Sequence, residues 1–170
     1  MFIIGTLVVY PAQGVGEIER IDQKEIGGAH CDFYIVRIRA NNITLMVPVR
    51  NAVNVGLRPL ISEEQAEKIL KELHGDLEKS VFTGQNWNRR FREYSERLKS
   101  PQLSVVADVL RELLLIGRTK ELSFGERRLL DQAMSLVSGE LAEVLSISAS
   151  ELRDELLALY APPALEEAGA

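Results

Sequence analysis

Residues 16–38, GEIERIDQKEIGGAHCDFYIVRI, contain two runs of alternating apolar and polar residues, separated by Gly27-Gly28. Alternation with a period of two is typical of strands that bury one face, and paired glycines suit a tight hairpin turn. Further β-rich runs occupy residues 7–10 and 43–47, and Asn41-Asn42 marks a second turn. Four or five short strands in the first 60 residues predict a small, strongly bent SH3-like or Tudor-like barrel.

The pattern changes near residue 60 to a helical period. Ser62-Glu63-Glu64-Gln65 is a capping-box sequence, and similar helix starts recur at Ser123 and Ser148. Pro101 suits the opening of a further helix, and Gly117 suits its end. These signals predict five helices, over residues 62–74, 86–99, 102–116, 124–145 and 149–160.

The two patterns together predict an α+β protein with two domains. We expect a β-domain over residues 1–59, a compact all-helical domain over 60–160 and a disordered tail over 161–170.

The charge distribution is uneven. The net charge of −5 argues against a protein that coats nucleic acid by bulk electrostatics, but residues 86–99 carry a local net charge of +3. No apolar run approaches the roughly 20 residues of a membrane span, and the N-terminus does not resemble a signal peptide. The single cysteine, Cys31, excludes an internal disulfide and fits a reducing compartment, so we expect a cytoplasmic protein.

Catalytic chemistry has little support in the sequence. The only histidines are His30 and His74, one in each predicted domain. Cys31 follows His30 in a strand-like run, where adjacent side chains point to opposite faces and cannot form a nucleophile–base pair. The chain has no zinc-protease, CxxC or P-loop motif. We therefore expect no enzyme activity, no metal and no cofactor.

Residues 86–94, NWNRRFREY, combine the only tryptophan with two further aromatic residues and three arginines. Helical spacing predicts that Phe91, Tyr94 and Leu98 form a packing stripe. Trp87 at the start of the helix has two interpretations: it fills a seam between helices, or it projects beside the arginines to stack on a base or wedge into a groove.

Five segments, taken together, carry a resemblance to a known family. They are residues 9–16 (VYPAQGVG), 44–49 (TLMVPV), 55–58 (VGLR), 87–94 (WNRRFREY) and 122–127 (LSFGER). In order and spacing, over residues 7 to about 160, the chain resembles the CarD/CdnL group of bacterial RNA polymerase-binding transcription regulators.

The resemblance implies that the Tudor-like domain binds the β subunit of RNA polymerase, partly by strand addition to a sheet edge. Matching positions are Met46 and Pro48, with Val36, Arg37 and Arg50 as weaker candidates.

The resemblance also implies that the helical domain lies at the upstream edge of the transcription bubble. There Trp87 would enter the minor groove and hinder bubble collapse, chiefly at promoters with short-lived open complexes, such as those for ribosomal RNA. The resemblance implies that Trp87, Arg89 and Arg90 contact the DNA, and Arg92 and Arg97 of the same basic segment are further candidate DNA-binding residues. If the five cations of residues 86–99, which are these four arginines and Lys99, all contacted phosphates, log K for DNA binding would fall against log salt concentration with a slope of about −4.5. Because the protein around this segment is acidic, free DNA binding should be weak and not sequence-specific.

The chain departs from CarD proper, which carries an additional basic and acidic tail, so it resembles the shorter CdnL type. A transcription-repair coupling factor shares the N-terminal module, but its helicase motifs are absent. Two other functions stay open from the residues themselves. One is a polymerase-bound adaptor whose helices recruit another protein, and the other is a KOW-like RNA or ribosome binder.

Overall fold

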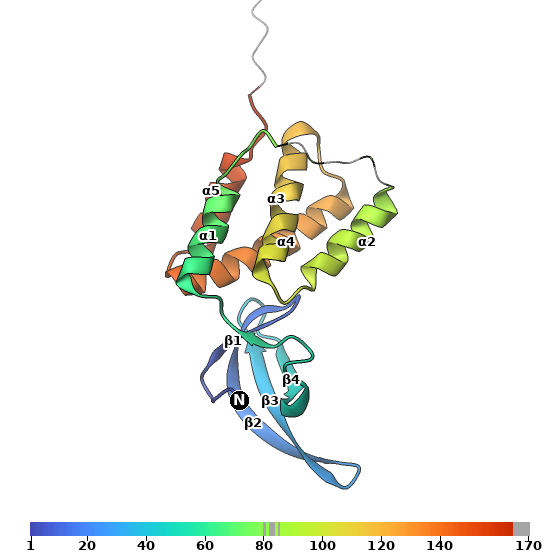
Figure 1. Cartoon of the computed structure of the whole chain (residues 1–170), viewed down its shortest axis with the longest axis vertical. Coiled ribbons are helices and arrows are strands. Elements are labelled where there is room, and N and C mark those ends of the chain that lie inside the picture. The colour runs from blue at the N-terminus through green and yellow to red at the C-terminus, as the bar shows by residue number, and fades with distance from the viewer. Residues whose placement is uncertain (80, 82–83, 85, 165–170) are drawn as a thin grey trace, which may run out of the picture.

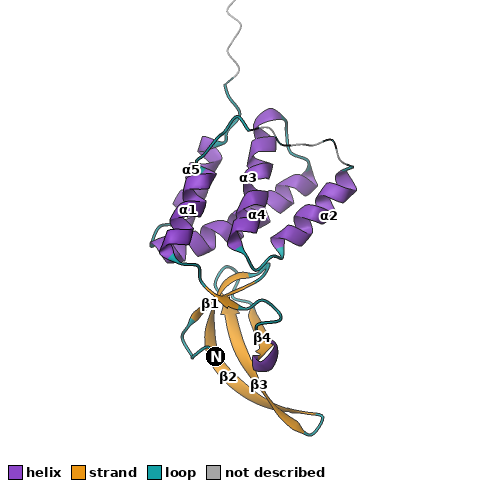
Figure 2. Cartoon of the chain, viewed as in Figure 1, coloured by secondary structure: helices purple, strands orange, loops and turns teal. Residues whose placement is uncertain are grey.

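The computed structural model describes residues 1–79, 81, 84 and 86–164, which form a β-domain followed by a helical domain (Figure 1 and Figure 2). The predicted α+β class is confirmed, with a small Tudor-like β-domain preceding five helices in the described part of the chain. The expected disorder of residues 161–170 falls mainly on 165–170, which lie outside the described residues.

The β-domain is one antiparallel sheet with the strand order β4-β3-β2-β1-β5. Its strands are β1 (Leu7–Tyr10), β2 (Gly14–Ile26), β3 (Ala29–Ile38), β4 (Thr44–Pro48) and β5 (Arg58–Pro59). A 3₁₀ turn, η1 (Val49–Asn51), follows β4. Because β4 and β5 terminate the strand order, each leaves one edge without a strand partner in the described sheet.

The β2–β3 hairpin is the longest feature of the sheet and projects from the molecule at the end opposite the helices (Figure 1). Its turn lies at Gly27 and Gly28, as predicted, with φ angles of 59° and 81°. Positive φ at both central residues is what a type I′ hairpin turn requires. A register shift between Ile18 and Arg20 marks a β-bulge, which bends the sheet more strongly.

Burial does not alternate strictly along the strands, because four consecutive residues of β3, Phe33 to Val36, are all buried. The β-domain core consists of apolar side chains from the four strands β1 to β4 and from the loop that follows η1. Its members are Val8, Ile18, Tyr34, Val36, Ile38, Val47, Ala52 and Leu57.

The helices begin and end close to their predicted bounds. They are α1 (Glu63–Leu73), α2 (Trp87–Leu98), α3 (Leu103–Thr119), α4 (Phe124–Leu145) and α5 (Ala149–Leu159). Capping boxes form at Ser62 with Gln65 and at Ser123 with Glu126, because each serine side chain accepts the N3 amide while the N3 side chain accepts the serine amide.

The third helix differs from its prediction at both ends. Gly117 does not end it, since hydrogen bonding continues to the Lys120 amide, which donates to the Ile116 carbonyl at 3.1 Å. Pro101 does not open the helix, which begins at Leu103, and the Pro101 carbonyl instead accepts a hydrogen bond from Arg58 of the β-domain. The helix therefore begins one residue later and ends three residues later than predicted.

Candidate functional site

The outer edge of β4 exposes unpaired backbone groups. The Ile38 amide donates to the Ile43 carbonyl at 2.8 Å, so this opposed pair is hydrogen-bonded. Hydrogen-bonded and non-hydrogen-bonded pairs alternate in an antiparallel ladder, and Ile35 lies opposite Met46 in a non-hydrogen-bonded pair. The N–H and C=O groups of Met46 therefore point away from β3 toward the open edge.

The side chains predicted to bind polymerase surround this edge with different exposures. Met46 is 45% exposed, and its sulfur lies 3.7 Å from the Lys24 ammonium nitrogen. Pro48, which ends the strand, is half-buried. Arg37 is exposed and pairs with Glu19 at 3.3 Å. These groups lie within reach of a strand added beside β4.

Arg50 and Val36 differ in their exposure to solvent. Arg50 is exposed in η1, directly after β4. Val36 is fully buried in the β-domain core, and its strand pairs with both β2 and β4. Neither the side chain nor the backbone of Val36 is available to an outside strand. Its position suits a residue that supports β4 from within the core.

Trp87 is the first residue of α2 and lies against the start of α4. The Asn86 side chain caps the helix by accepting the Asn88 amide at 2.8 Å. The half-buried indole packs on Gly125, where an added Cβ would lie only 3.0 Å from the indole Cζ2 atom. Glycine at position 125 therefore permits the close approach of the ring to the α4 backbone.

Two neighbours on α2 also hold the indole. The Trp87 and Phe91 ring centroids are 5.7 Å apart, and the Arg90 guanidinium carbon lies 5.3 Å from the Trp87 ring centroid. Arg90 is only 9% exposed, and its Nε and Nη1 atoms have no hydrogen-bond partner among the described residues. A desolvated guanidinium beside an indole is attracted to the ring face, so Arg90 braces Trp87.

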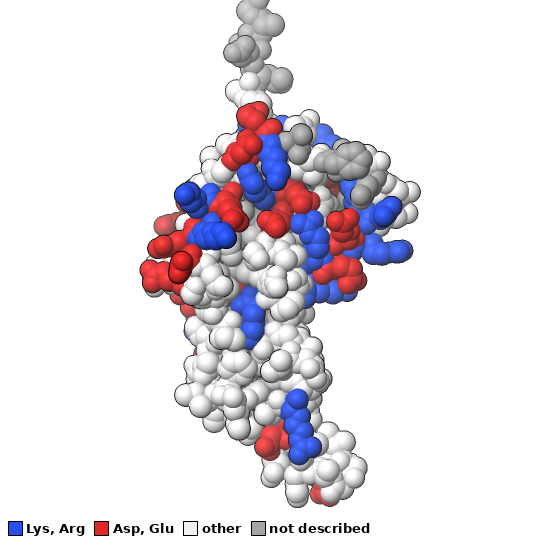
Figure 3. All heavy atoms as spheres, in the orientation of Figure 1, with Lys and Arg blue, Asp and Glu red and all other residues white. Residues whose placement is uncertain are grey.

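The remaining predicted DNA-binding arginines fall into two groups. Arg89 and Arg92 are exposed, and within the described part of the chain no ion pair involves either of them. Arg97 instead forms a two-pronged pair with Glu112 at 3.1 and 3.2 Å. In the view of Figure 3, charges of both signs cover the helical domain, whereas the β-domain is largely uncharged. The freely available positive charge on α2 is smaller than the sequence count.

The predicted packing stripe of α2 is confirmed at two of its three positions. Tyr94 and Leu98 are 4% and 1% exposed. Burial, followed by the nearby Glu112, raises the pKa of Tyr94 to about 12, so its phenol stays neutral. The prediction for Phe91 was wrong, because this ring is 41% exposed and lies against Trp87.

Phe124 is a site residue that the sequence reasoning missed. It is the first residue of α4, precedes the glycine that contacts Trp87, and is 83% exposed. We define the aromatic surface as Trp87, Phe91 and Phe124. A signal was present in the sequence, since an aromatic residue directly after an N-cap serine lies outside the apolar stripe of the helix.

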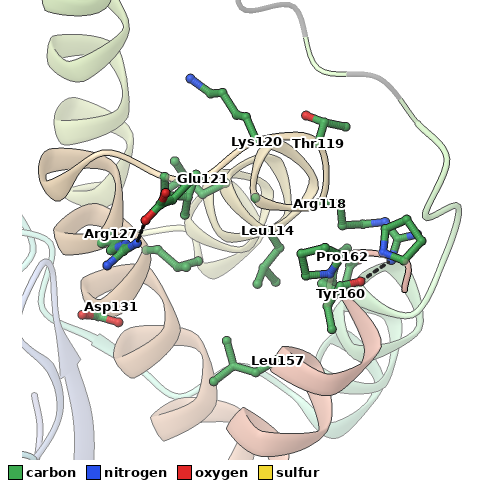
Figure 4. Close-up of a pocket in the computed structure, with 16 residues that line it drawn as sticks. Leu114, Arg118, Thr119, Lys120, Glu121, Arg127, Asp131, Leu157, Tyr160 and Pro162 are labelled. Carbon is green, nitrogen blue, oxygen red and sulfur yellow. Dashed lines mark hydrogen bonds and ion pairs between the residues drawn. The ribbon is translucent and has the colours of Figure 1, made fainter. Parts of the chain in front are cut away.

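A separate groove of about 870 Å³ lies between α3, α4 and the end of α5. Figure 4 shows Leu114 and Leu157 on its walls, with an Arg127–Glu121 ion pair of 2.8 Å at its rim. The charges at this rim are thus already partly compensated. None of the predicted site residues lines the groove.

The residues considered for catalysis lie in different parts of the fold. His30 and Cys31 are neighbours on β3, and His74 follows α1, where it contacts Glu155 of α5. The described residues include no group of three or more His, Cys, Asp or Glu side chains that could hold a metal ion. None of the described helices is both long and apolar enough to cross a membrane.

Comparison with known protein families identifies the family of this chain. The family described as "CarD, C-terminal domain" matches residues 68–157, more than half of the chain. The chain belongs to the CarD/CdnL family. The "CarD-like/TRCF RID domain" matches residues 2–61, so the two CarD-type regions follow each other as the sequence resemblance implied.

Two relatives extend the comparison. A Bacillus subtilis (strain 168) protein named "Putative transcription factor YdeB" is 27% identical over 154 residues, covering 90% of this chain and 98% of its own length. The solved structure of CdnLNt from Myxococcus xanthus is 43% identical, with a TM-score of 0.32, and the match covers 37% of this chain and 89% of that one.

Membership of the CarD/CdnL family makes this chain a transcription regulator of a non-enzymatic family. The family also suggests an interaction with RNA polymerase.

Proposed function

We propose that this CarD/CdnL protein binds the RNA polymerase β subunit through the open edge of β4. In this proposal Trp87 stabilises the promoter open complex at the upstream edge of the bubble. The β4 edge acts as the tether, and the aromatic surface acts on DNA. The protein is then concentrated with RNA polymerase on the nucleoid in the cytoplasm.

The observation that carries the proposal is the open edge at Met46. A strand laid beside β4 would find the Met46 N–H and C=O groups directed toward it, with the exposed Met46 side chain beside them. Arg37 and Arg50 are exposed near this strand and offer charged contacts, while Pro48 limits how far the added strand can extend. Val36 contributes by holding β4 in place.

The aromatic surface supports the second half of the proposal. A braced indole loses little conformational freedom when it stacks on a base, and such stacking contributes about 1–3 kcal/mol. Arg89 and Arg92 flank the aromatic surface with exposed positive charge for phosphates. Arg90 acts mainly on Trp87, and Arg97 is engaged by Glu112. These weak contacts become effective because the β-domain delivers them at high local concentration.

The deciding experiment is capture of purified polymerase β-subunit fragments by the full-length protein. We expect wild type to bind and Met46→Arg to lose binding, because the substitution buries a charge at the contact. Met46→Pro removes only an N–H that β3 does not use, so it should also abolish capture while the sheet stays folded. Val53→Arg changes an 84% exposed apolar residue that lies outside β4 and serves as the control.

Failure of wild type to bind any β fragment would overturn the tether. Retained binding by both Met46 variants would move the contact to another surface.

A polymerase-bound adaptor is the second candidate function. The 83% exposure of Phe124 favours it, because exposed aromatic residues anchor protein interfaces as well as nucleic acids. Protection of DNA at the upstream bubble edge distinguishes the two functions. Protection that disappears in Trp87→Ala excludes the adaptor, whereas unchanged protection supports it.

A further inference from the structure

The junction between the two domains gathers residues from several of the sequence motifs. Gly56, with φ of +85°, lies so close to Pro11 that an added Cβ would approach the Pro11 Cγ atom to 2.7 Å, and Pro101 lies at 3.5 Å. Gly14 faces the Leu136 side chain of α4. Pro11 and Gly14 belong to the VYPAQGVG segment and Gly56 to the VGLR segment, so these motifs form contacts between the domains as well as within the β-domain.

Arg58 of β5 is the centre of this junction. Its Nη1 and Nη2 atoms donate to the two carboxylate oxygens of Glu140 at 2.6 and 2.8 Å. Its Nε atom donates to the Pro101 carbonyl in the α2–α3 loop, and Nη1 also reaches the Pro59 carbonyl at 3.0 Å. One planar guanidinium therefore joins the β-domain to α4 and to the end of α2.

Glu140 is buried in the middle of α4, with its side chain 1% exposed. Besides Arg58 it accepts the Ile61 amide at 3.1 Å, so both of its oxygens are hydrogen-bonded. Leu136, Glu140 and Glu143 recur at helical spacing on the α4 face that meets the β-domain. A satisfied buried carboxylate tolerates little change in geometry, because any displacement leaves a charge without its partner.

The Arg58–Glu140 pair influences the position of Trp87 relative to the β-domain. Trp87 begins α2, and the opposite end of α2 leads through Ser100 to Pro101, which Arg58 holds. A helix of 12 residues is about 18 Å long, so a tilt of about 10° at the junction would move the Trp87 end by about 3 Å. A wedge that must meet one base step would not tolerate such a displacement.

We propose that Arg58 and Glu140 are positioning residues that lock the two domains in one orientation. Through this lock, the position of the β4 edge on polymerase determines the position of Trp87 on the DNA. Neither Arg58 nor Glu140 contacts polymerase or DNA in this proposal. The effect of this lock on open-complex lifetime rests on the proposed function. The lock itself is a property of the free protein, so it is tested without polymerase or DNA.

The first measurement is the distribution of distances between two spin labels, one in each domain, by double electron–electron resonance. Labels at Glu25→Cys in β2 and Arg153→Cys in α5, in a Cys31→Ser background, report the orientation. We expect Arg58→Met and Glu140→Gln to broaden or shift the distribution. Glu140→Gln keeps the side-chain shape, and it decides the test if Arg58→Met does not fold by circular dichroism.

A matched control lies on the same helix face. Arg39 and Glu143 form an exposed ion pair across the same junction, with Arg39 48% and Glu143 29% exposed. An exposed pair of this kind fixes geometry weakly, so Glu143→Gln should leave the distribution as in wild type. An unchanged distribution in Glu140→Gln, or equal broadening in Glu143→Gln, would overturn the lock.

The second measurement links orientation to function in the full polymerase–promoter complex. We expect Glu140→Gln to bind polymerase within about twofold of wild type, yet to shorten the open-complex lifetime by about fivefold or more. If wild type itself fails to bind or to stabilise, the proposed function fails while the distance result stands. A changed orientation with an unchanged lifetime would contradict the positioning role alone.

Discussion

The β4 edge and the aromatic surface present different chemistry to a partner. At β4 the groups directed outward belong to the backbone, and the Met46 side chain only accompanies them. At the start of α2 the groups are side chains, held by a buried arginine on one side and a glycine of α4 on the other. Binding through backbone groups tolerates many side-chain changes, whereas binding through braced rings depends on each ring and on what holds it.

Among variants that keep polymerase binding, substitution of Trp87 should give the largest effect on function. Loss of a stacking aromatic worth about 1–3 kcal/mol shortens the open-complex lifetime by about 5- to 150-fold. Because the β4 edge is far from this change, polymerase β capture should stay as in wild type. Measuring both quantities on Trp87→Ala tests the separation of the two surfaces. A wild-type lifetime in this variant would rule out the wedge.

Val36 and Met46 should separate stability from binding within the β-domain. Val36→Ala removes two fully buried methyl groups and should lower the free energy of unfolding by about 2 kcal/mol. Met46→Ala alters a half-exposed side chain and should change it by less than about 0.5 kcal/mol. Amide hydrogen exchange of the β3–β4 ladder measures both changes locally. Equal losses of protection would mean that Met46 is part of the core.

The parts of the fold that local sequence determines were predicted well. The Gly27-Gly28 turn and the capping boxes at Ser62 and Ser123 depend on residues within a few positions of each other. Two local signals misled the prediction, because α3 continues past Gly117 to Thr119, and the Phe91 ring lies against Trp87 of the same helix instead of in the core.

The site was harder to predict because its partners are distant in sequence. Gly125 lies 38 residues from Trp87, and Glu140 lies 82 residues from Arg58. A count of arginines could not reveal that Arg90 is buried against an indole or that Arg97 is engaged by Glu112. Such pairings are fixed by helix packing, which the period of one helix does not encode.

The salt dependence of open-complex lifetime should show how few arginines act on phosphates. If only the exposed Arg89 and Arg92 contribute, the protein should add about −1.8 to the slope of log lifetime against log salt concentration. Five cations would add about −4.5. The measurement is the lifetime over a range of salt, with and without the protein. Arg89→Gln should reduce the added slope by about 0.9, while Arg97→Gln should leave it unchanged. A slope near that of five cations would mean that the Arg90 and Arg97 contacts rearrange on DNA and that Lys99 also contacts a phosphate.

The smallest expected effect concerns pH and the far side of the helical domain, away from both surfaces. The Leu70 carbonyl, 2.7 Å from Nδ1 of His74, raises the pKa of this histidine above 6.5. Burial opposes the shift, and Glu155, 2.7 Å from Nε2, adds to it. The protonated ring can donate to both partners at once, whereas a neutral ring can donate to only one.

Because the folded pKa of His74 is raised, its contribution to stability is fully present below pH 6.5 and is lost as pH rises through the folded value. Glu155 is 60% exposed, so solvent screening limits the effect to a few tenths of a kcal/mol. Urea denaturation at pH 5.5 and pH 8 should show slightly higher stability at the lower pH, and His74→Gln should remove that increment. The same change of pH should leave polymerase capture unaltered, since neither surface includes this pair. An increment that persists in His74→Gln would assign the pH dependence to another group.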